Sequence, residues 1–112
     1  MSFIPEFVAI QPFGTPNLIE ITDTSTGSDT RIVTRRIYIR KADGSYIVED
    51  GNTNDYIDWA YPNMSITLDV LKKDVAVEIT VQWLYINPFT YYPTIIYSKV
   101  TIYGFTEYNE MF

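Results

Sequence analysis

The stretch Val75–Tyr85, VAVEITVQWLY, alternates apolar and polar side chains throughout most of its length. Successive side chains of a β-strand point to opposite faces, so this period of two predicts a strand with one face in a core. The face predicted to point inward carries Val75, Val77, Ile79, Val81 and Trp83. The opposite face carries Ala76, Glu78, Thr80 and Gln82. The pattern therefore favours a sheet over a helix.

Several further stretches show the same period and are separated by clusters of turn residues. LIEIT (18–22), SITLDV (65–70) and a stretch near Thr94–Tyr103 are predicted to be strands, and SYIV (45–48) is predicted to return from the turn ADGS. The side chains predicted to point inward are Ile19, Ile21, Ile66, Leu68, Val70, Ile96, Val100 and Ile102. Six or seven short strands of this kind predict an antiparallel β-sandwich.

The stretch RIVTRRIYIRK (31–41) contains one exception to its own alternation. Val33, Ile37 and Ile39 share the apolar parity, but Arg35 falls on that parity as well. A charged side chain is costly to bury. We therefore expect a β-bulge at Arg35, or a strand that joins the sheet only from Arg36 onward.

The composition limits the chemistry that this chain can perform. Its 112 residues fit one domain, and they include neither cysteine nor histidine. Thiol nucleophiles and zinc–thiolate sites are therefore excluded, and the usual general base near neutral pH is missing. The net charge of −6 disfavours binding to nucleic acid or to an anionic membrane. These features argue against an enzyme, and we expect no cofactor.

The two ends of the chain are apolar and are predicted to be arms. Residues 1–17 carry Pro5, Pro12 and Pro16, which favour an extended N-terminal arm outside the middle of a sheet. This segment lacks a basic start and is broken by prolines, so we do not expect a secretory signal. The predicted divisions are the N-terminal arm at 1–17, the sandwich at 18–104, and a C-terminal arm or short helix at 105–112. The aromatic residues expected to dock these arms on a neighbour are Phe3, Phe7, Phe13, Phe105, Tyr108 and Phe112.

Two loops are rich in carboxylates and hydroxyls but lack the spacing of a calcium site. An EF-hand loop has glycine at its sixth position and glutamate at its twelfth. If Asp23 in ITDTSTGSD (21–29) is the first position, Gly27 falls at the fifth and Thr34 at the twelfth. DGNTNDYID (50–58) also fails at both positions. A nonstandard calcium site is the alternative, but ordinary polar loops with Asx turns explain both stretches. We predict no metal site and no catalytic residue.

Five basic residues lie between Arg31 and Lys41, and they allow two interpretations. Arg36 and Arg40, with Tyr38 between them, could contact nucleic acid on a strand face. They could instead complement an acidic protein surface. The negative net charge favours the protein surface.

The segment WLYINPFTYYPTIIY (83–97) concentrates aromatic residues around two prolines. The loop expected at residues 87–93 contains Phe89, Tyr91 and Tyr92, and three aromatic side chains of one short loop cannot all turn inward. Aromatic residues with a polar group are enriched at protein–protein interfaces, which is the interpretation that we favour. The alternative is a platform that stacks on sugar rings, as in a carbohydrate-binding module.

Parts of the sequence resemble immunoglobulin-like domains. TDTSTG (22–27), followed by a strand and the Asp43–Gly44 turn, resembles the first half of a PKD-type domain, although Ile37 and Ile39 stand where that motif has Trp and Phe. LKKDVAVEIT (71–80) resembles the corner between the fifth and sixth strands of immunoglobulin domains, without its tyrosine and cysteine. These matches cover about residues 18–84 and imply a fold rather than a function.

Over its whole length, the chain resembles small virion structural proteins of tailed bacteriophages, in particular the crAss-like group. The stretches that carry this resemblance are DTSTGSD, RRIYIRKADGSY, SITLDVLKKDVAVEITVQWL and YGFTEYNE. The resemblance implies an immunoglobulin-like β-sandwich in a capsid, neck or tail, made in the host cytoplasm. Its partners would be other virion proteins in multiple copies, without nucleic acid or membrane, and it brings no catalytic residues.

Overall fold

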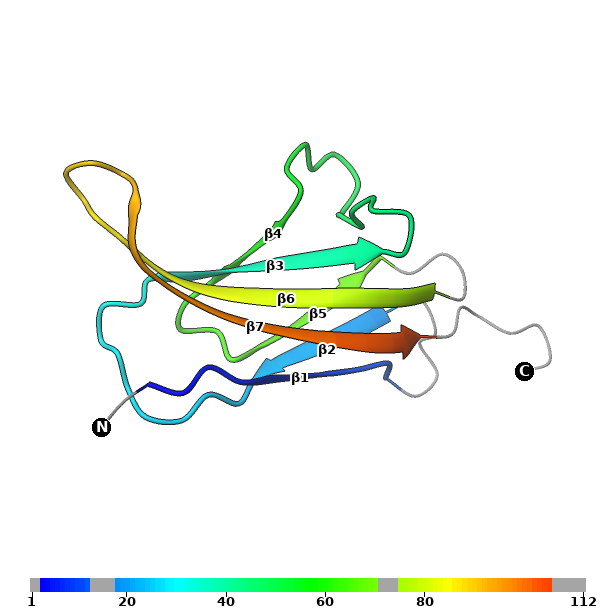
Figure 1. Cartoon of the computed structure of the whole chain (residues 1–112), viewed down its shortest axis with the longest axis horizontal. Coiled ribbons are helices and arrows are strands. Elements are labelled where there is room, and N and C mark those ends of the chain that lie inside the picture. The colour runs from blue at the N-terminus through cyan, green and yellow to red at the C-terminus, as the bar shows by residue number, and fades with distance from the viewer. Residues whose placement is uncertain (1–2, 13–17, 71–74, 106–112) are drawn as a thin grey trace.

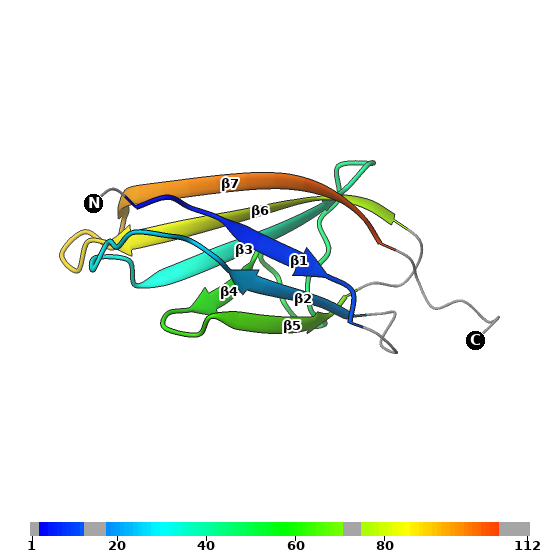
Figure 2. The same cartoon turned by 90° about the horizontal axis from the view of Figure 1, so that it is seen from below.

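The computed structural model describes residues 3–12, 18–70 and 75–105. These residues contain seven β-strands and no helix: β1 (Phe7–Ile10), β2 (Leu18–Asp23), β3 (Thr34–Lys41), β4 (Ile57–Ala60), β5 (Ser65–Asp69), β6 (Val75–Ile86) and β7 (Pro93–Phe105). They form two sheets, in the orders β1-β2-β5 and β4-β3-β6-β7. All pairings are antiparallel, and the sheets lie over one another as a β-sandwich (Figures 1 and 2). The predicted all-β, antiparallel architecture is confirmed.

The core is made by the apolar faces that the alternation predicts. Ile19 and Ile21 of β2 and Ile37 and Ile39 of β3 are completely buried, and β6 adds the same face of its long strand. The buried side chains that β6 contributes to this core are Val77, Ile79, Val81 and Trp83. Burying apolar area of this extent is the main driving force for closing the two sheets on each other.

The chain after β3 forms the predicted turn but not the predicted return strand. Gly44 has a φ of 90°, and Lys41 and Ser45 close the turn through a backbone hydrogen bond of 2.8 Å. Beyond it, residues 45–48 make only an isolated bridge between Tyr46 and Arg40. On the edge of β3 away from β6, the strand that pairs with it is β4, which the polar stretch before Ile57 did not lead us to predict.

Strand β7 forms as predicted, but its predicted inward face is wrong. Its register with β6 pairs Tyr97 with Trp83, and Trp83 points into the core, so Tyr97 lies on the inner face. Ile96 and Val100 lie on the other face and are 51% and 50% exposed. Both sets of alternate side chains in this strand include apolar residues, so the register with β6 determines which set faces the core. Ile102 was predicted to point inward as well, and its side chain is not among those described.

The N-terminal segment is part of the sandwich rather than a separate arm. Residues 7–10 form β1, an edge strand that pairs with β2, and Phe7 is only 2% exposed. Ile4, before this strand, makes an isolated antiparallel β-bridge with Thr26, which follows β2. Residues 7–10, which the predicted division assigns to the arm, thus pair with β2 of the chain's own sandwich. Pro5 and Pro12 flank this short strand at a sheet edge, where proline is tolerated.

Candidate functional site

The first unusual feature is Arg35, which is fully buried in the middle of the sandwich. Strand β3 pairs with β6 without interruption from Thr34 to Lys41, so the predicted bulge is wrong and Arg35 occupies a regular inward position. Val33 shares the parity of Ile37 and Ile39, but it precedes the strand and is 49% exposed. The strand tolerates a buried guanidinium because the interior supplies an anion for it.

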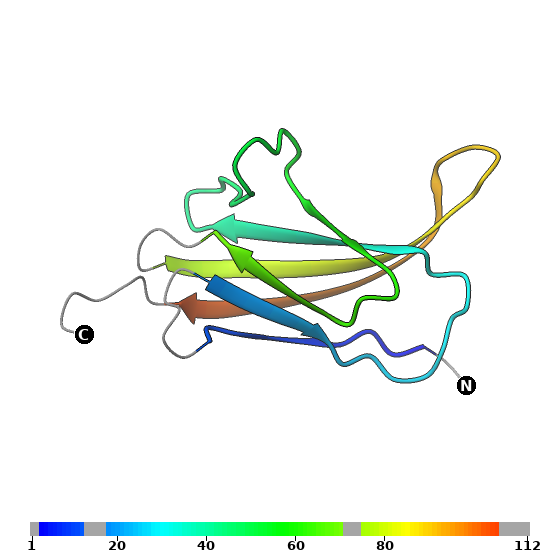
Figure 3. The same cartoon turned by 180° about the vertical axis from the view of Figure 1, so that it is seen from behind.

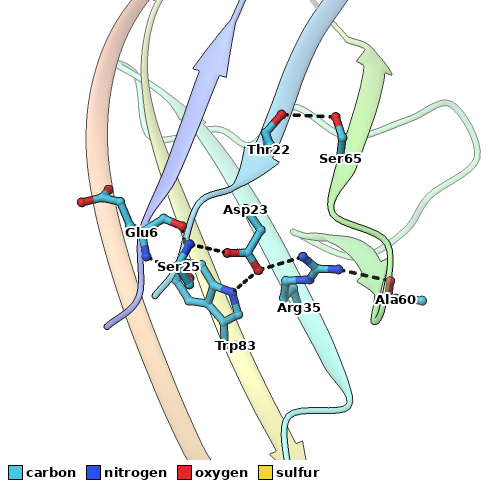
Figure 4. Close-up of polar contacts among 8 residues, drawn as sticks. All are labelled: Glu6, Thr22, Asp23, Ser25, Arg35, Ala60, Ser65 and Trp83. Atoms are coloured by element: carbon cyan, nitrogen blue, oxygen red, sulfur yellow. Dashed lines mark hydrogen bonds and ion pairs between the residues drawn. The ribbon is translucent and has the colours of Figure 1, made fainter. Parts of the chain in front are cut away.

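That anion is Asp23, the last residue of β2, which is itself buried. Nη1 of Arg35 donates to Oδ2 of Asp23 at 2.9 Å, and Nε1 of Trp83 donates to the same oxygen at 2.9 Å (Figure 4). Nη2 of Arg35 reaches the carbonyl oxygen of Ala60 at 3.4 Å. The guanidinium also lies 3.9 Å above the ring of Trp59, in a cation–π contact. The pair is thus held between the two sheets.

A second layer of hydrogen bonds ties this ion pair to the N-terminal segment. Oδ1 of Asp23 accepts the backbone N–H of Ser25 at 2.9 Å. Oγ of Ser25 accepts the backbone N–H of Glu6 at 3.0 Å and donates to the carbonyl oxygen of Glu6 at 3.2 Å (Figure 4). The position of residues 3–6 therefore depends on the same carboxylate that neutralises Arg35.

Burial and pairing oppose each other in the titration of these groups. Burial by itself raises the pKa of the Asp23 carboxyl, but hydrogen bonds from Ser25 and Trp83 and the charge of Arg35 outweigh it, so the pKa is lowered. For Arg35, burial lowers the pKa against the opposing effect of Asp23. Since a guanidinium is not deprotonated in proteins, Arg35 keeps its charge at neutral pH despite this lowering of its pKa. The buried pair is ionised.

The buried cluster is not completely satisfied. Nε of Arg35 and Nε1 of Trp59 are buried and have no hydrogen-bond partner among the described residues. Leaving such donors unpaired costs about 1–3 kcal/mol each. A buried ion pair with two unpaired donors in its cluster therefore stabilises the core less than apolar side chains of the same volume would.

A cavity of about 150 Å³ lies beside this cluster. Residues lining it include Phe3, Asp23, Ser28, Tyr61, Met64 and Trp83. They come from the N-terminal segment, the end of β2, the β2–β3 loop, the β4–β5 turn and β6. These loops and the β6–β7 turn lie at the same end of the sandwich (Figures 1 and 3).

The turn between β6 and β7 carries the most exposed aromatic side chains of the described residues. Phe89, Tyr91 and Tyr92 are 90%, 80% and 74% exposed. Their turn projects beyond the body of the sandwich (Figure 1). The prediction that these three side chains cannot all turn inward is confirmed, and all three are exposed.

Asn87 fixes the shape of this turn. Its Oδ1 accepts the backbone N–H groups of Phe89 and Thr90, and its carbonyl oxygen accepts the N–H of Tyr91. Tyr91 has a φ of 61°, a backbone conformation that residues other than glycine rarely adopt. Such strain concentrates at functional positions. We call residues 87–92 the aromatic tip. Its backbone is held in a defined conformation by the hydrogen bonds of Asn87.

The outer face of β3 brings together three of the predicted interface residues. Arg36, Tyr38 and Arg40 alternate along it, opposite the inward Arg35, Ile37 and Ile39. The guanidinium of Arg36 lies 4.3 Å from the ring of Tyr56, and Tyr38 packs between Tyr46 and Tyr56 at centroid distances of 6.1 and 5.6 Å. Arg36 and Arg40 make no ion pair with any described residue. This face is a second candidate contact surface.

The remaining predicted interface residues fall into three groups. Phe3 is half-buried against Trp83 and Tyr97, at centroid distances of 6.0 and 4.8 Å, and Phe7 is in the core. Neither is therefore available as an arm residue. Phe105 is the last residue of β7. Phe13, Tyr108 and Phe112, with most of the predicted C-terminal arm or helix, lie outside the described residues.

The sequence did contain a signal for the buried cluster that our prediction missed. Asp23 continues the apolar parity of Ile19 and Ile21 at the end of β2, as Arg35 does in β3. Two opposite charges at inward positions of neighbouring segments indicate a buried ion pair. The prediction of a bulge at Arg35, or of a strand that begins at Arg36, considers Arg35 without Asp23, and the regular pairing from Thr34 contradicts both forms of it.

The described residues contain no group of three or more histidine, cysteine, aspartate or glutamate side chains placed to hold a metal ion. Across the same residues, no helix has the length and apolar character to span a bilayer. The chain matches no protein-family model, no curated protein and no solved structure.

Proposed function

We propose that this chain is a non-enzymatic structural component of a phage virion, in the capsid, neck or tail, that docks on neighbouring virion proteins through its aromatic tip. The observation that carries the docking role is the exposure of Phe89, Tyr91 and Tyr92 on a turn that Asn87 holds in shape. Exposed aromatic side chains on a rigid support are typical binding hot spots. The virion setting rests on the sequence resemblance to small phage structural proteins.

The strand order supports an immunoglobulin-like sandwich, as the resemblance implies. In that fold, the first, second and fifth strands share one sheet, and the third, sixth and seventh share the other. Strands β1, β2 and β5 are so grouped here, as are β3, β6 and β7, with β4 at the edge beside β3. The aromatic tip then corresponds to the loop between the last two strands, which serves recognition in antibody variable domains.

The fold changes which part of the chain we assign to docking. Deleting residues 1–16 would remove β1 and Phe7 from the sandwich, so such a deletion tests folding rather than assembly. The aromatic tip can be altered without touching the core. We therefore place the contact with other virion proteins at the tip, with Arg36 and Arg40 on the outer face of β3 as a surface for an acidic partner.

The test is incorporation into particles. Particles would be purified from host cells propagating the genome that encodes the chain, and copies per particle counted by mass spectrometry. We expect the unaltered chain at a fixed copy number, and we expect the triple variant Phe89→Ser, Tyr91→Gly, Tyr92→Ser to be lost from particles while it stays folded. A matched control replaces exposed residues elsewhere: Val8→Ser, Ile10→Ser, Val100→Ser. Absence of the unaltered chain from particles would refute the proposal.

The competing function is carbohydrate binding by the aromatic tip, since rings of tyrosine also stack on sugars. A glycan array followed by titration of any hit separates the two. Saturable glycan binding that is lost in Tyr91→Ala or Tyr92→Ala, together with normal incorporation of the triple variant, would replace virion docking by glycan recognition. Binding to no glycan together with loss of incorporation supports virion docking.

A further inference from the structure

The chain contains two Asp–Gly sequences, Asp43–Gly44 and Asp50–Gly51, and both lie between β3 and β4. Glycine has no side chain to shield its backbone nitrogen, so this nitrogen can attack the carboxyl carbon of the preceding aspartate. Every other aspartate of the chain is followed by a β-branched or aromatic residue, which hinders the attack. The two Asp–Gly sequences are therefore the positions at which the chain could modify itself.

The reaction is an isomerisation in two steps. The glycine nitrogen forms a bond to the aspartate side-chain carbon, and the amide proton and the carboxyl hydroxyl leave together as water. The five-membered succinimide ring that results is then hydrolysed. Breaking the new bond restores aspartate, whereas breaking the bond to the main-chain carbonyl carbon gives isoaspartate, in which the backbone runs through the side chain. Water is the only co-reactant.

The fold holds both reacting groups of Asp43–Gly44. The backbone N–H of Gly44 donates to the carbonyl oxygen of Lys41 at 2.9 Å. Oδ1 of Asp43 accepts the backbone N–H of Ser45 at 2.9 Å and its hydroxyl at 2.6 Å. These hydrogen bonds from Ser45 also lower the pKa of Asp43, which reduces the uncharged form that can lose its hydroxyl. We therefore expect this site to be protected.

Asp50–Gly51 has the same sequence but a different position within its turn. The turn is closed by the backbone N–H of Asn52, which donates to the carbonyl oxygen of Glu49 at 3.0 Å, and Gly51 has a φ of 84°, as in a type II turn. The N–H of Gly51 and the carboxylate of Asp50 have no hydrogen-bond partner among the described residues. Both residues are exposed, and no neighbouring atom lies within 4 Å of the place where a Cβ on Gly51 would stand. Both reacting groups are free to meet.

We propose that Asp50 is a site of spontaneous isoaspartate formation in the folded chain, and that the fold protects Asp43 from the same reaction. The two sites share their reacting residues, so the difference between them comes from the hydrogen bonds that one has and the other lacks. This modification is independent of the proposed docking by the aromatic tip.

The product changes the outer face of β3. Isoaspartate adds one atom to the backbone just before Gly51 and Asn52. Nδ2 of Asn52 donates to the carbonyl oxygen of Tyr56 at 3.0 Å, and its Oδ1 accepts the N–H of Asn54 at 2.8 Å. The ring of Tyr56 in turn lies 4.3 Å from the guanidinium of Arg36. A longer backbone at residue 50 therefore displaces Asn52 and, through it, the tyrosine that supports Arg36.

The first experiment compares the two sites within one molecule. The folded chain is incubated at physiological temperature and digested with trypsin, which cuts after Lys41 and Lys72 and leaves both Asp–Gly sequences in one peptide. Isoaspartate has the mass of aspartate, and electron-transfer fragmentation locates it. We expect it to form at Asp50 at least about tenfold faster than at Asp43, because reaction at Asp43 must first break the hydrogen bonds of Gly44 and Ser45.

Unfolding and two variants test the cause of the difference. In guanidinium chloride, the rate at Asp43 should rise by about tenfold or more, to that of Asp50, because the protecting hydrogen bonds are gone. Ser45→Ala removes the hydroxyl donor and should raise the rate at Asp43 in the folded chain, with no change at Asp50. The matched control is Thr53→Ala, which alters another exposed residue between β3 and β4 and should change neither rate.

NMR tests the effect on the outer face of β3. Nε of Arg36 is buried and has no hydrogen-bond partner among the described residues, so its N–H signal reports on the nearby Tyr56 ring. We expect this signal to shift in the isomerised fraction. Asp50→Glu keeps the charge but cannot close a five-membered ring, so its Arg36 signal should stay unchanged through the same incubation.

Each result decides a separate part of the proposal. A folded chain that forms no isoaspartate at Asp50, or forms it equally fast at Asp43, overturns the site. A rate at Asp43 that unfolding leaves unchanged overturns the protection by the fold. Isomerisation of Asp50 without a shift of the Arg36 signal overturns the effect on the outer face of β3. None of these results bears on docking by the aromatic tip, which particle incorporation tests.

Discussion

The buried cluster around Asp23 and the aromatic tip are both exceptions to the usual placement of residues, in opposite directions. The cluster puts two charges inside the sandwich, and the tip puts three aromatic rings outside it. Inside, the charges find each other, a tryptophan N–H and backbone groups. Outside, the rings of Phe89, Tyr91 and Tyr92 are 90%, 80% and 74% exposed.

The difference teaches where function is to be sought. The buried polar cluster satisfies most of its own hydrogen-bonding groups, so a structural role accounts for it. The exposed rings on a turn held by Asn87 contribute no such packing, and exposed apolar groups of this kind indicate a binding surface.

The largest expected effect comes from breaking the ion pair. Arg35→Met leaves the Asp23 carboxylate buried without its cation, and we expect the free energy of unfolding to fall by about 3–5 kcal/mol. The double variant Arg35→Met, Asp23→Asn should recover a substantial part of that loss, because no uncompensated charge is left inside. Urea denaturation followed by circular dichroism measures both. A single variant as stable as the unaltered chain would show that the pair is not buried as described.

The two buried tryptophans provide a matched comparison within the cluster. Trp83 donates its indole N–H to Asp23, whereas the N–H of Trp59 has no partner among the described residues. Phenylalanine at either position removes the same atoms, so the lost hydrogen bond to a charged group should make Trp83→Phe more destabilising by about 1.5–3 kcal/mol. Denaturation curves of the two variants test the difference. Equal stabilities would mean that the indole N–H of Trp83 contributes nothing.

Acid should weaken the sandwich through two aspartates. The pKa values of Asp23 and Asp29 are lowered in the folded chain, that of Asp29 from 3.8 to about 2, where the hydrogen bonds of Arg31 are the main cause. A lowered folded pKa gives stability that is present above the unfolded value and is lost as pH falls through the folded one. Urea midpoints should therefore drop as pH falls from about 4 toward 2. Asp29→Asn should flatten only part of this dependence, since Asp23 still titrates.

The smallest expected effect on stability belongs to the tip. Phe89→Ser and Tyr92→Ser change side chains that are 90% and 74% exposed, and we expect each to alter the free energy of unfolding by less than about 0.5 kcal/mol. Asn87→Ala, which removes the side-chain acceptor for Phe89 and Thr90, should cost more, about 1 kcal/mol. Thermal unfolding compares the three. A large loss from Phe89→Ser would show that the tip packs on the chain itself.

The patterns that the sequence predicted correctly are those in which one face is apolar and the other polar. Ile19 and Ile21, or Val77 and Ile79, have only one arrangement that hides their surface, so alternation alone placed them. Strand β7 carries apolar residues on both parities, and there the prediction failed. The short strand β4 was missed because the polar stretch before it resembles a loop, and it pairs with β3 all the same.

By itself, the sequence determined an all-β antiparallel domain, the inward faces of β2 and β6, and the exposure of the aromatic tip. These follow from local period and composition, which any sheet must obey. Only the tertiary structure decided that Arg35 is buried, because its burial depends on Asp23, which lies in another strand and another sheet. It also decided the face of β7 and the place of residues 7–10. Each of these depends on a partner that is distant along the chain, and a local pattern carries no information about such a partner.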